Sequence, residues 1–172
     1  SSTRDLDLLL TQITTVISRE FGFYHVGIFL LDTAKEFAIL SAANSDGGQI
    51  MLRRGHRLKV GEIGIVGYVT GTGTPRVALD TGADAVFFNN PDLPETQSEM
   101  ALPLVEGGIV LGALDVQSQE SNAFSDEDLE TLTTLAELVS IAIQNAKLYE
   151  QMDRSLAEAE AASRQYFREN WN

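Results

Sequence analysis

The chain has no cysteine, only four prolines, and twelve basic residues against twenty-five acidic ones. Without cysteine it forms no disulfide and has no thiolate metal site, cysteine nucleophile or thioether-linked cofactor. The formal net charge of −13 at pH 7 argues against nucleic acid and anionic membrane surfaces as partners, because both would repel this chain. No apolar run approaches the length of a membrane span, and no signal peptide is visible. We therefore expect a cytoplasmic protein segment that contacts neither nucleic acid nor membrane.

The length of 172 residues and the hydrophobic content of 44% fit one domain with helical extensions. The chain begins without an initiator methionine, and its helical pattern continues up to its last residues. We expect it to be a piece of a longer protein.

Hydrophobic periodicity predicts the order of the elements. Apolar residues recur at helical spacing from Leu6 to Ile17, and Gly22 is placed to end that helix. A short buried helix is expected over residues 63–70, ended by Gly71-Thr72-Gly73, and a loop or one helical turn over residues 83–94. Asp46-Gly47-Gly48 is interpreted as a turn. Strands are expected at residues 24–31, 37–43, 50–60 and 75–79.

Residues 95–118 predict a hairpin of two apolar strands joined by Gly107-Gly108. Its second strand is apolar on both faces, so we expect both faces to be covered: one by the terminal helices, the other by residues 63–94. Alternation with a period of two places Asp115 and Gln117 on the face of Leu111 and Ala113. That face turns polar at one end, as the wall of a pocket would.

The last helix is predicted to begin after Ser125, an N-cap residue with Asp128 as the acid of a capping box. It carries two apolar stripes. The stripe expected to pack on the sheet contains Leu129, Leu132, Ala136, Val139, Ile143 and Ala146. The other follows a coiled-coil heptad through Leu135, Leu138, Ala142, Asn145, Tyr149, Met152, Leu156 and Ala159. We interpret it as the seam of a dimeric signalling helix; the alternative is a helix that folds back on its own chain.

Four ordered motifs carry a resemblance to a known family. They are VGEIGIVGYV at residues 60–69, NPDLPETQSEM at 90–100, GALDVQS at 112–118 and AFSDED at 123–128. With them the chain resembles a GAF domain of the kind found in bacterial sensor histidine kinases and related signalling proteins. The resemblance implies an α+β fold: an antiparallel β-sheet with N- and C-terminal helices on one face and a pocket-covering helix and loop segment on the other.

The expected organisation has three parts. Residues 1–20 form an N-terminal helix that packs on the sheet and joins a dimer interface. Residues 21–150 form the GAF core. Residues 151–172 form the beginning of a coiled-coil signalling helix.

The chemistries known for GAF domains need residues that this chain lacks, which excludes most of their cofactors here. Covalent bilin attachment and free methionine sulfoxide reduction both need cysteines that this chain lacks. Cyclic-nucleotide GAF domains carry an Asn-Lys pair, which does not occur in this sequence. His25 and His56 have no acid partners at metal-ligand spacing, so we interpret them as structural or surface residues and expect no metal and no haem.

The candidate ligand-binding residues are Glu99, Asp115, Gln117, Tyr68, Phe87, Phe88, Met100 and Ile65. Glu99 and Asp115 match the substrate-binding acids of the reductases, and Gln117 replaces a further acid, so the resemblance implies amino-group recognition with weaker charge. The alternative is that Asp115 ends its strand by bonding backbone amides while Glu99 is solvated. Phe87 and Phe88 suit a flexible lid over a ligand.

We therefore predict a non-catalytic sensory module of a larger signalling protein, with a histidine kinase as the expected parent. It would bind a small molecule whose identity the sequence does not give, and relay its state to an output domain through a homodimeric exit helix. The dimer helix residues are Leu135, Leu138, Tyr149, Met152 and Leu156. Two alternatives remain: a structural dimerisation module whose own side chains fill the pocket, and a small-molecule enzyme, for which no nucleophile–base pair can be identified.

Overall fold

The structure, a computed structural model, describes residues 2–171, and their side chains from residue 4 onward. Its centre is a six-stranded antiparallel sheet in the order β3-β2-β1-β6-β5-β4. The elements in chain order are α1 (Ser2–Phe21), β1 (His25–Leu31), β2 (Phe37–Ala43), α2 (Asp46–Arg53), β3 (Arg57–Lys59), α3 (Gly64–Thr72), β4 (Arg76–Ala78), η1 (Thr81–Ala83), β5 (Ser98–Glu106), β6 (Ile109–Ser118) and α4 (Asp126–Trp171).

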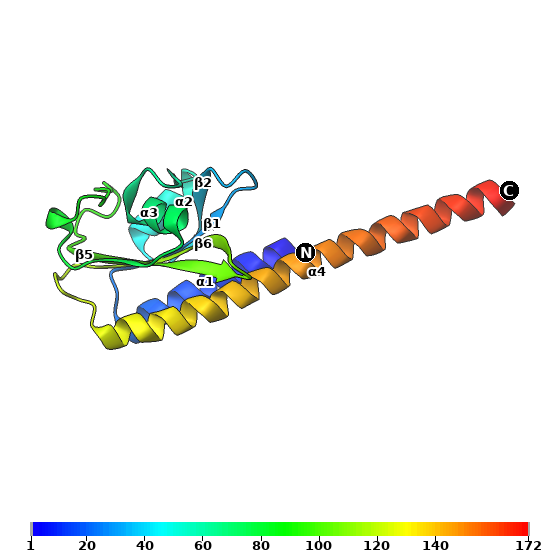
Figure 1. Cartoon of the computed structure of the whole chain (residues 1–172). Helices are drawn as coiled ribbons and strands as arrows, with labels where there is room; N and C mark the ends of the chain where they lie inside the picture. The colour runs from blue at the N-terminus through cyan, green and yellow to red at the C-terminus, as the bar shows by residue number, and fades with distance from the viewer. Residues whose placement is uncertain (1, 172) are drawn as a thin grey trace.

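The sheet is covered on both faces, as the apolar strand in the hairpin predicted. Helices α1 and α4 lie side by side under one face, while α2, α3 and the loop before β5 lie over the other (Figure 1). Each face has its own apolar core. On the side of α1 and α4 the core includes Leu10, Leu102, Leu114, Leu132 and Ile143. On the other side it includes Phe29, Met51, Leu58, Ile65 and Val69. The α+β fold expected from the sequence is confirmed.

The hairpin of β5 and β6 is confirmed together with its turn. Gly107 and Gly108 both have positive φ angles, 60° and 77°, which is the backbone that a two-residue turn of type I′ requires. Glu99 faces Gln117 across the two strands, and Ala101 faces Asp115. The register therefore brings three polar side chains to one face near the end of the hairpin.

The prediction of a strand over residues 50–60 is wrong in its first part. Asp46–Arg53 is helix α2, and only Arg57–Lys59 pairs with β2. The Ser45 side chain caps the helix by accepting a hydrogen bond from the Gly48 amide at 2.9 Å. Gly47 stands in the first turn because the loop before β5 packs closely there: a Cβ at this position would lie 2.1 Å from the Asp92 carbonyl oxygen. The Asp-Gly-Gly sequence marks the start of a helix, where we had expected a turn.

The capping box of α4 is confirmed: the Asp128 amide donates to Ser125 Oγ at 3.1 Å, and the Ser125 amide donates to Asp128 Oδ2 at 3.0 Å. The stripe predicted to pack on the sheet has Leu132, Ala136, Val139 and Ile143 buried. Leu135 is half-buried against the same core.

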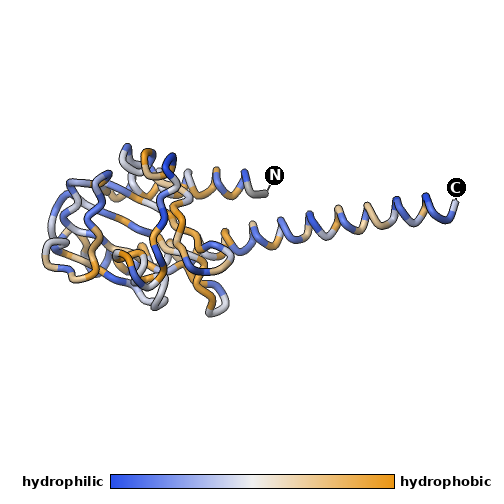
Figure 2. Tube along the Cα trace, turned by 90° about the horizontal axis from the view of Figure 1, so that it is seen from above, coloured by the Kyte–Doolittle hydropathy of each residue, from blue (hydrophilic) through white to orange (hydrophobic). Residues whose placement is uncertain are grey.

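Beyond the sheet, α4 continues as a single helix and does not fold back within residues 2–171 (Figure 1). Residues 151–171 are all exposed. The trace there is largely hydrophilic with isolated apolar positions (Figure 2). Four of those predicted for the seam are 58–64% exposed: Leu138, Tyr149, Met152 and Leu156. Among the described residues, none of the helices combines the length and the apolar character that crossing a membrane would need.

Candidate functional site

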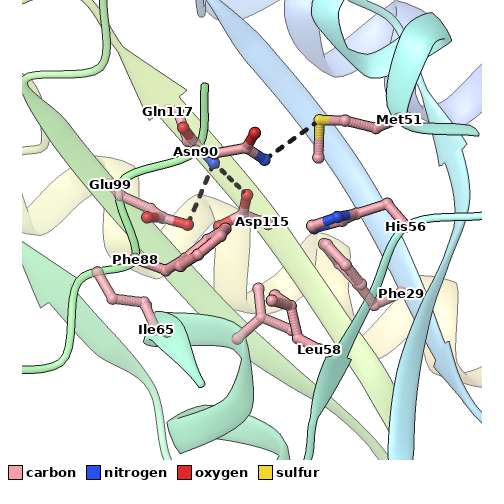
Figure 3. Close-up of a pocket in the computed structure, with 12 residues that line it drawn as sticks. Phe29, Met51, His56, Leu58, Ile65, Phe88, Asn90, Glu99, Asp115 and Gln117 are labelled. Carbon is pink, nitrogen blue, oxygen red and sulfur yellow. Dashed lines mark hydrogen bonds between the residues drawn. The ribbon is translucent and has the colours of Figure 1, made fainter. Parts of the chain in front are cut away.

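A small cavity lies between the sheet and the elements that cover it on the side of α2 and α3. It is lined by Phe29, Met51, His56, Leu58, Gly64, Ile65, Val66, Phe88, Asn90, Glu99, Asp115 and Gln117 (Figure 3). The free space is about 20 Å³. That is room for roughly one water molecule. In this conformation the side chains themselves occupy most of the site.

Two buried acids and one amide form the polar wall of the cavity. Gln117 Nε2 donates to Asp115 Oδ2 at 2.7 Å and to Glu99 Oε2 at 3.2 Å. The three side chains belong to residues that are 1–7% exposed. Asp115 therefore does not end its strand by bonding backbone amides, and Glu99 is not solvated, which were the alternatives considered from the sequence.

The Gln117 amide also connects the acids to the loop before β5. Its Oε1 accepts a hydrogen bond from Thr96 Oγ1 at 2.6 Å. Both ends of the amide are thus used, and its orientation is fixed by one donor on one side and two acceptors on the other.

Burial raises the pKa of the Glu99 carboxyl well above its ordinary value, and the neighbouring Asp115 carboxyl raises it further by charge and hydrogen bonding. Two carboxyls this close in a dry site are not both ionised at low energy cost. We therefore expect Glu99 to keep its proton to a higher pH than an ordinary glutamate does.

No lysine or arginine lines the cavity to balance these acids. The two histidines on this side of the sheet do not supply a cation either. Burial lowers the pKa of His56 to about 4, with a further contribution from the Arg54 charge. Burial also lowers the pKa of His25, although the Asp115 charge opposes this. At neutral pH the site consists of acids, amides and neutral imidazoles within apolar walls.

Residues 84–97 form a lid over the cavity, held near both ends by ion pairs. Arg76 contacts Asp84 at 3.2 Å, and Arg54 contacts Asp92 at 2.7 Å. Between them, the Asn90 side chain reaches Met51 Sδ at 3.5 Å. Phe88 is 40% exposed although it lines the cavity, so it separates the cavity from solvent.

The structure brings together Ile65, Phe88, Glu99, Asp115 and Gln117 among the candidate residues. The other three lie elsewhere. The Tyr68 ring packs beneath the Arg76 guanidinium at 4.6 Å. Phe87 is half-buried against the core beside α3. Met100 is fully buried in the core beside α1 and α4, because it alternates with Glu99 along β5 and so points through the other face of the sheet.

Several lining residues were not anticipated, namely Phe29, Met51, His56, Leu58 and Asn90. Phe29 could have been assigned to the cavity from the alternation of side chains along β1. Met51 and His56 carried no such signal, because the segment that contains them was interpreted as a strand and is instead a helix followed by a turn.

Comparisons with known proteins agree with this geometry. The sequence profile described as "GAF domain" matches residues 3–144. The GAF domain-containing protein A of Dictyostelium discoideum is 26% identical over 130 residues, which is 76% of each chain.

Solved structures show the same fold at low sequence identity. The GAF domain from a phosphoenolpyruvate-protein phosphotransferase of Coxiella burnetii aligns with a TM-score of 0.76 at 23% identity, covering 85% of this chain and 86% of that one. The type II free methionine-R-sulfoxide reductase of Thermoplasma acidophilum aligns with a TM-score of 0.72 at 18% identity, covering 84% and 96%. With a family profile that spans most of its length and a two-sided sheet that encloses a cavity, this chain belongs to the GAF domain family.

Proposed function

We propose that this GAF domain is a non-catalytic sensory module that binds a small primary amine between Glu99 and Asp115 and relays its occupancy through α4. GAF domains are commonly regulatory modules that bind small molecules. The amine, the absence of catalysis and the relay are our additions.

The observation that supports an amine ligand is the position of the Gln117 amide. Its nitrogen lies between two buried carboxyl groups and donates to both. A primary ammonium offers three N–H donors and a positive charge, so it satisfies the same two acceptors and neutralises the acids as well. An anionic ligand would meet two acids and no lining arginine or lysine. The charge of the site therefore favours a cation.

Entry of a ligand requires the lid to move, since the free space now holds roughly one water. Phe88 separates the cavity from solvent, and the ion pair of Arg54 with Asp92 ties its segment to α2. The apolar walls of Phe29, Leu58 and Ile65 would then pack against the carbon skeleton of the amine.

The composition of the cavity supports a role without catalysis. Among the described residues that line it there is no serine, threonine, cysteine, lysine or tyrosine, so no hydroxyl, thiol or amine nucleophile stands beside the acids. Within residues 2–171, no group of three or more histidine and acidic side chains is arranged to hold a metal ion. The solved reductases share the fold and carry out chemistry, but at 18–22% identity that likeness concerns the fold alone.

The relay rests on the exposed surface of α1 and α4. A groove of about 310 Å³ runs between them, lined almost entirely by apolar side chains such as Leu9, Ile13, Val16 and Leu138. The exposed seam of α4 continues this apolar surface past the sheet to Met152 and Leu156. We propose that a second copy packs here as a homodimer. The helix would pass a change in packing to an output domain, which we expect to be a cytoplasmic histidine kinase.

A ligand shifts such an equilibrium only if it binds one arrangement of the dimer more tightly than the other. Strand β6 contributes side chains to both faces of the sheet. Asp115 and Leu114 are consecutive in β6, so the first faces the cavity and the second faces the core between the sheet and α4. A shift of β6 on ligand binding would therefore reach the helix directly.

The second candidate function is a structural dimerisation module without a ligand. The observation that favours it is the cavity volume of about 20 Å³, because the hydrogen-bonded Gln117 and the lid leave almost no space. The two candidates predict different responses to an added amine.

The test is thermal unfolding and calorimetric titration of the chain with ethylamine hydrochloride, with potassium chloride at equal ionic strength as the control. A sensory site predicts saturable binding and a rise in unfolding temperature that the Asp115→Asn variant loses. A melting temperature that is unchanged up to 100-fold excess, with no binding heat, would support the structural module instead. Sedimentation of the same protein tests the relay, because a stable monomer at micromolar concentration contradicts it.

A further inference from the structure

Two polar atoms of the described side chains are buried without a hydrogen-bond partner: His25 Nε2 and Asp115 Oδ1. The two residues are 0% and 1% exposed. A buried donor or acceptor left unpaired costs free energy, so native proteins rarely keep one without water or a ligand to satisfy it. Here two such atoms occur on the same face of the sheet.

The strand register places them close together. On β1 and β6, His25 pairs with Gln117 and Gly27 pairs with Asp115. A Cβ at Gly27 would lie 3.0 Å from His25 Nε2, so the imidazole leans along its strand and covers Gly27. Directly opposed Cβ positions are about 4.5–5.5 Å apart, so the imidazole and the Asp115 side chain lie on the same face of adjacent strands, and the Asp115 charge acts on the pKa of His25.

We call this place the imidazole notch and define it by His25 Nε2, Asp115 Oδ1 and the backbone of Gly27. Because Gly27 has no side chain, the imidazole lies directly over its backbone, and a Cβ there would also lie 3.1 Å from Leu40 Cδ1. Asp115 separates the notch from the acid pair, because its other oxygen, Oδ2, accepts from Gln117.

The hydrogen bonds of Ser45 fix the tautomer of His25. Ser45 Oγ accepts from the Gly48 amide at 2.9 Å and lies 2.6 Å from His25 Nδ1. Among the hydrogen bonds of the described residues, no other acceptor takes the Ser45 hydroxyl hydrogen, so it goes to Nδ1. The ring hydrogen of the neutral imidazole is then on Nε2. The notch therefore presents one donor, Nε2–H, and one acceptor, Asp115 Oδ1.

We infer that the imidazole notch is a hydroxyl subsite and that the ligand is a small amino alcohol with its amine and hydroxyl on neighbouring carbons. A hydroxyl both accepts and donates a single hydrogen bond in this geometry. An ammonium cannot accept from Nε2–H, and an ether or a carbonyl cannot donate to Asp115. Adjacent amine and hydroxyl groups match the two oxygens of one carboxylate, with the amine at Oδ2 and the hydroxyl at Oδ1.

A water molecule that bridged the two atoms would meet the same two requirements, and the ligand hydroxyl would take its place while keeping both hydrogen bonds. The inference rests on the proposed amine site, since it adds a second contact to the ligand bound there. It also assigns a role to His25, which the sequence had suggested to be a structural or surface residue.

The test compares three probes by calorimetric titration of the whole chain: ethanolamine, ethylamine and 2-methoxyethylamine, all as hydrochlorides. We expect ethanolamine to bind about tenfold more tightly than the other two, because only its hydroxyl pairs both buried atoms. Equal affinities of the three probes would overturn the inference and leave the proposed function standing. If none of the three binds, the proposed function fails and the inference fails with it.

Two variants of His25 form a matched pair. His25→Gln keeps an N–H donor near the position of Nε2, and His25→Leu removes it at similar volume. The leucine variant should lose the preference, so that it binds ethanolamine and ethylamine with equal affinity. The glutamine variant should keep part of the preference. A leucine variant that still prefers ethanolamine about tenfold would overturn the inference.

A measurement on the unmodified protein covers the case in which these variants fail to fold. Nitrogen-15 NMR of the imidazoles should show His25 with its hydrogen on Nε2. That resonance should shift on adding ethanolamine and stay in place on adding ethylamine. An Nδ1–H tautomer, or equal responses to both amines, contradicts the hydroxyl subsite.

Discussion

Gln117 and Asp115 are joined by a 2.7 Å hydrogen bond in which the amide nitrogen donates to the carboxylate, although both residues belong to the same strand. Because the same nitrogen also donates to Glu99, the amide occupies the place between two acids. In our account a ligand amine displaces or joins this amide when the lid opens. In the conformation described here the lid is closed over the site.

Replacing this amide by an acid tests the arrangement. Gln117→Glu has nearly the same shape, but it removes the donor and places a third carboxyl beside Asp115. We expect the free energy of unfolding at pH 7 to fall by about 1–3 kcal/mol. Added ethylamine should restore more stability to this variant than to the unmodified protein.

Gln119→Glu is the matched control. Gln119 follows the end of the same strand, but its hydrogen bond to Glu95 is exposed, so the change should stay within about 0.5 kcal/mol. Chemical denaturation of both variants measures the difference. If the two substitutions have equal effects, Gln117 does not bridge the acids in solution.

Glu99 predicts a specific dependence of stability on pH. Its carboxyl keeps its proton in the folded state at pH values at which the unfolded chain, with an ordinary pKa of 4.5, has lost it. Its contribution therefore favours folding below pH 4.5 and is lost as the pH rises through the raised folded pKa. The Glu99→Gln variant cannot ionise, so relative to it the unmodified protein should lose stability as the pH rises above 4.5.

Glu106→Gln, an exposed change on the same strand, is the control and should show no such divergence. His25 and His56 have the opposite sign: their pKa values are lowered on folding, so they reduce stability as the pH falls below 6.5. The two histidines have this effect in the unmodified protein and in both variants, so it cancels when the three stability curves are compared. Parallel curves for the unmodified protein and Glu99→Gln would show that Glu99 is not held protonated.

The Arg54–Asp92 ion pair should control the opening of the lid more than the stability of the fold. The two side chains are 45% and 21% exposed, so the pair contributes about 0.2–1 kcal/mol. Arg54→Gln should raise the hydrogen-exchange rate of the lid amides by up to about fivefold with little change in melting temperature. Lys59→Gln breaks another exposed ion pair, with Glu62, and should leave lid exchange unchanged. Identical exchange of the lid in both variants would contradict this role.

The seam of α4 predicts a clear difference between two positions on one helix. Leu156 lies on the seam and Ala161 on the outer side of the heptad, and both are exposed in the single chain. Leu156→Lys should weaken the dimer by about tenfold or more, because an apolar side chain buried in each copy is replaced by a charge. Ala161→Lys should leave the dimer intact. Analytical ultracentrifugation measures both constants, and equal values would exclude this seam as the interface.

Much of the fold was predictable because local chemistry and global packing agree. The Gly107-Gly108 turn, the capping box of Ser125 and Asp128, and the two-sided apolar strand each have one dominant physical interpretation. Helix α2 was missed because its Asp-Gly-Gly start resembles a turn. The reason for Gly47 lies in the close approach of Asp92, forty-five residues later in the chain.

The acid wall of the site was predictable from alternation and resemblance, since Asp115 and Gln117 share one face of β6 and Glu99 lies opposite. The imidazole side of the site was not predictable in this way. The role of His25 depends on Gly27 being bare and on Ser45 fixing the tautomer, and both are tertiary relationships. Met100 was assigned to the pocket although one step along β5 places it on the opposite face.

The most direct test of the central claim counts protons during amine binding. Ethanolamine is titrated into the protein at pH 6 in buffers with different ionisation enthalpies, and the buffer dependence of the heat gives the protons exchanged. We predict saturable binding with release of up to about one proton, because the arriving ammonium replaces the proton held by Glu99. The absence of binding would contradict an amine site between Glu99 and Asp115. So would binding that releases no proton and has the same affinity in the Glu99→Gln variant.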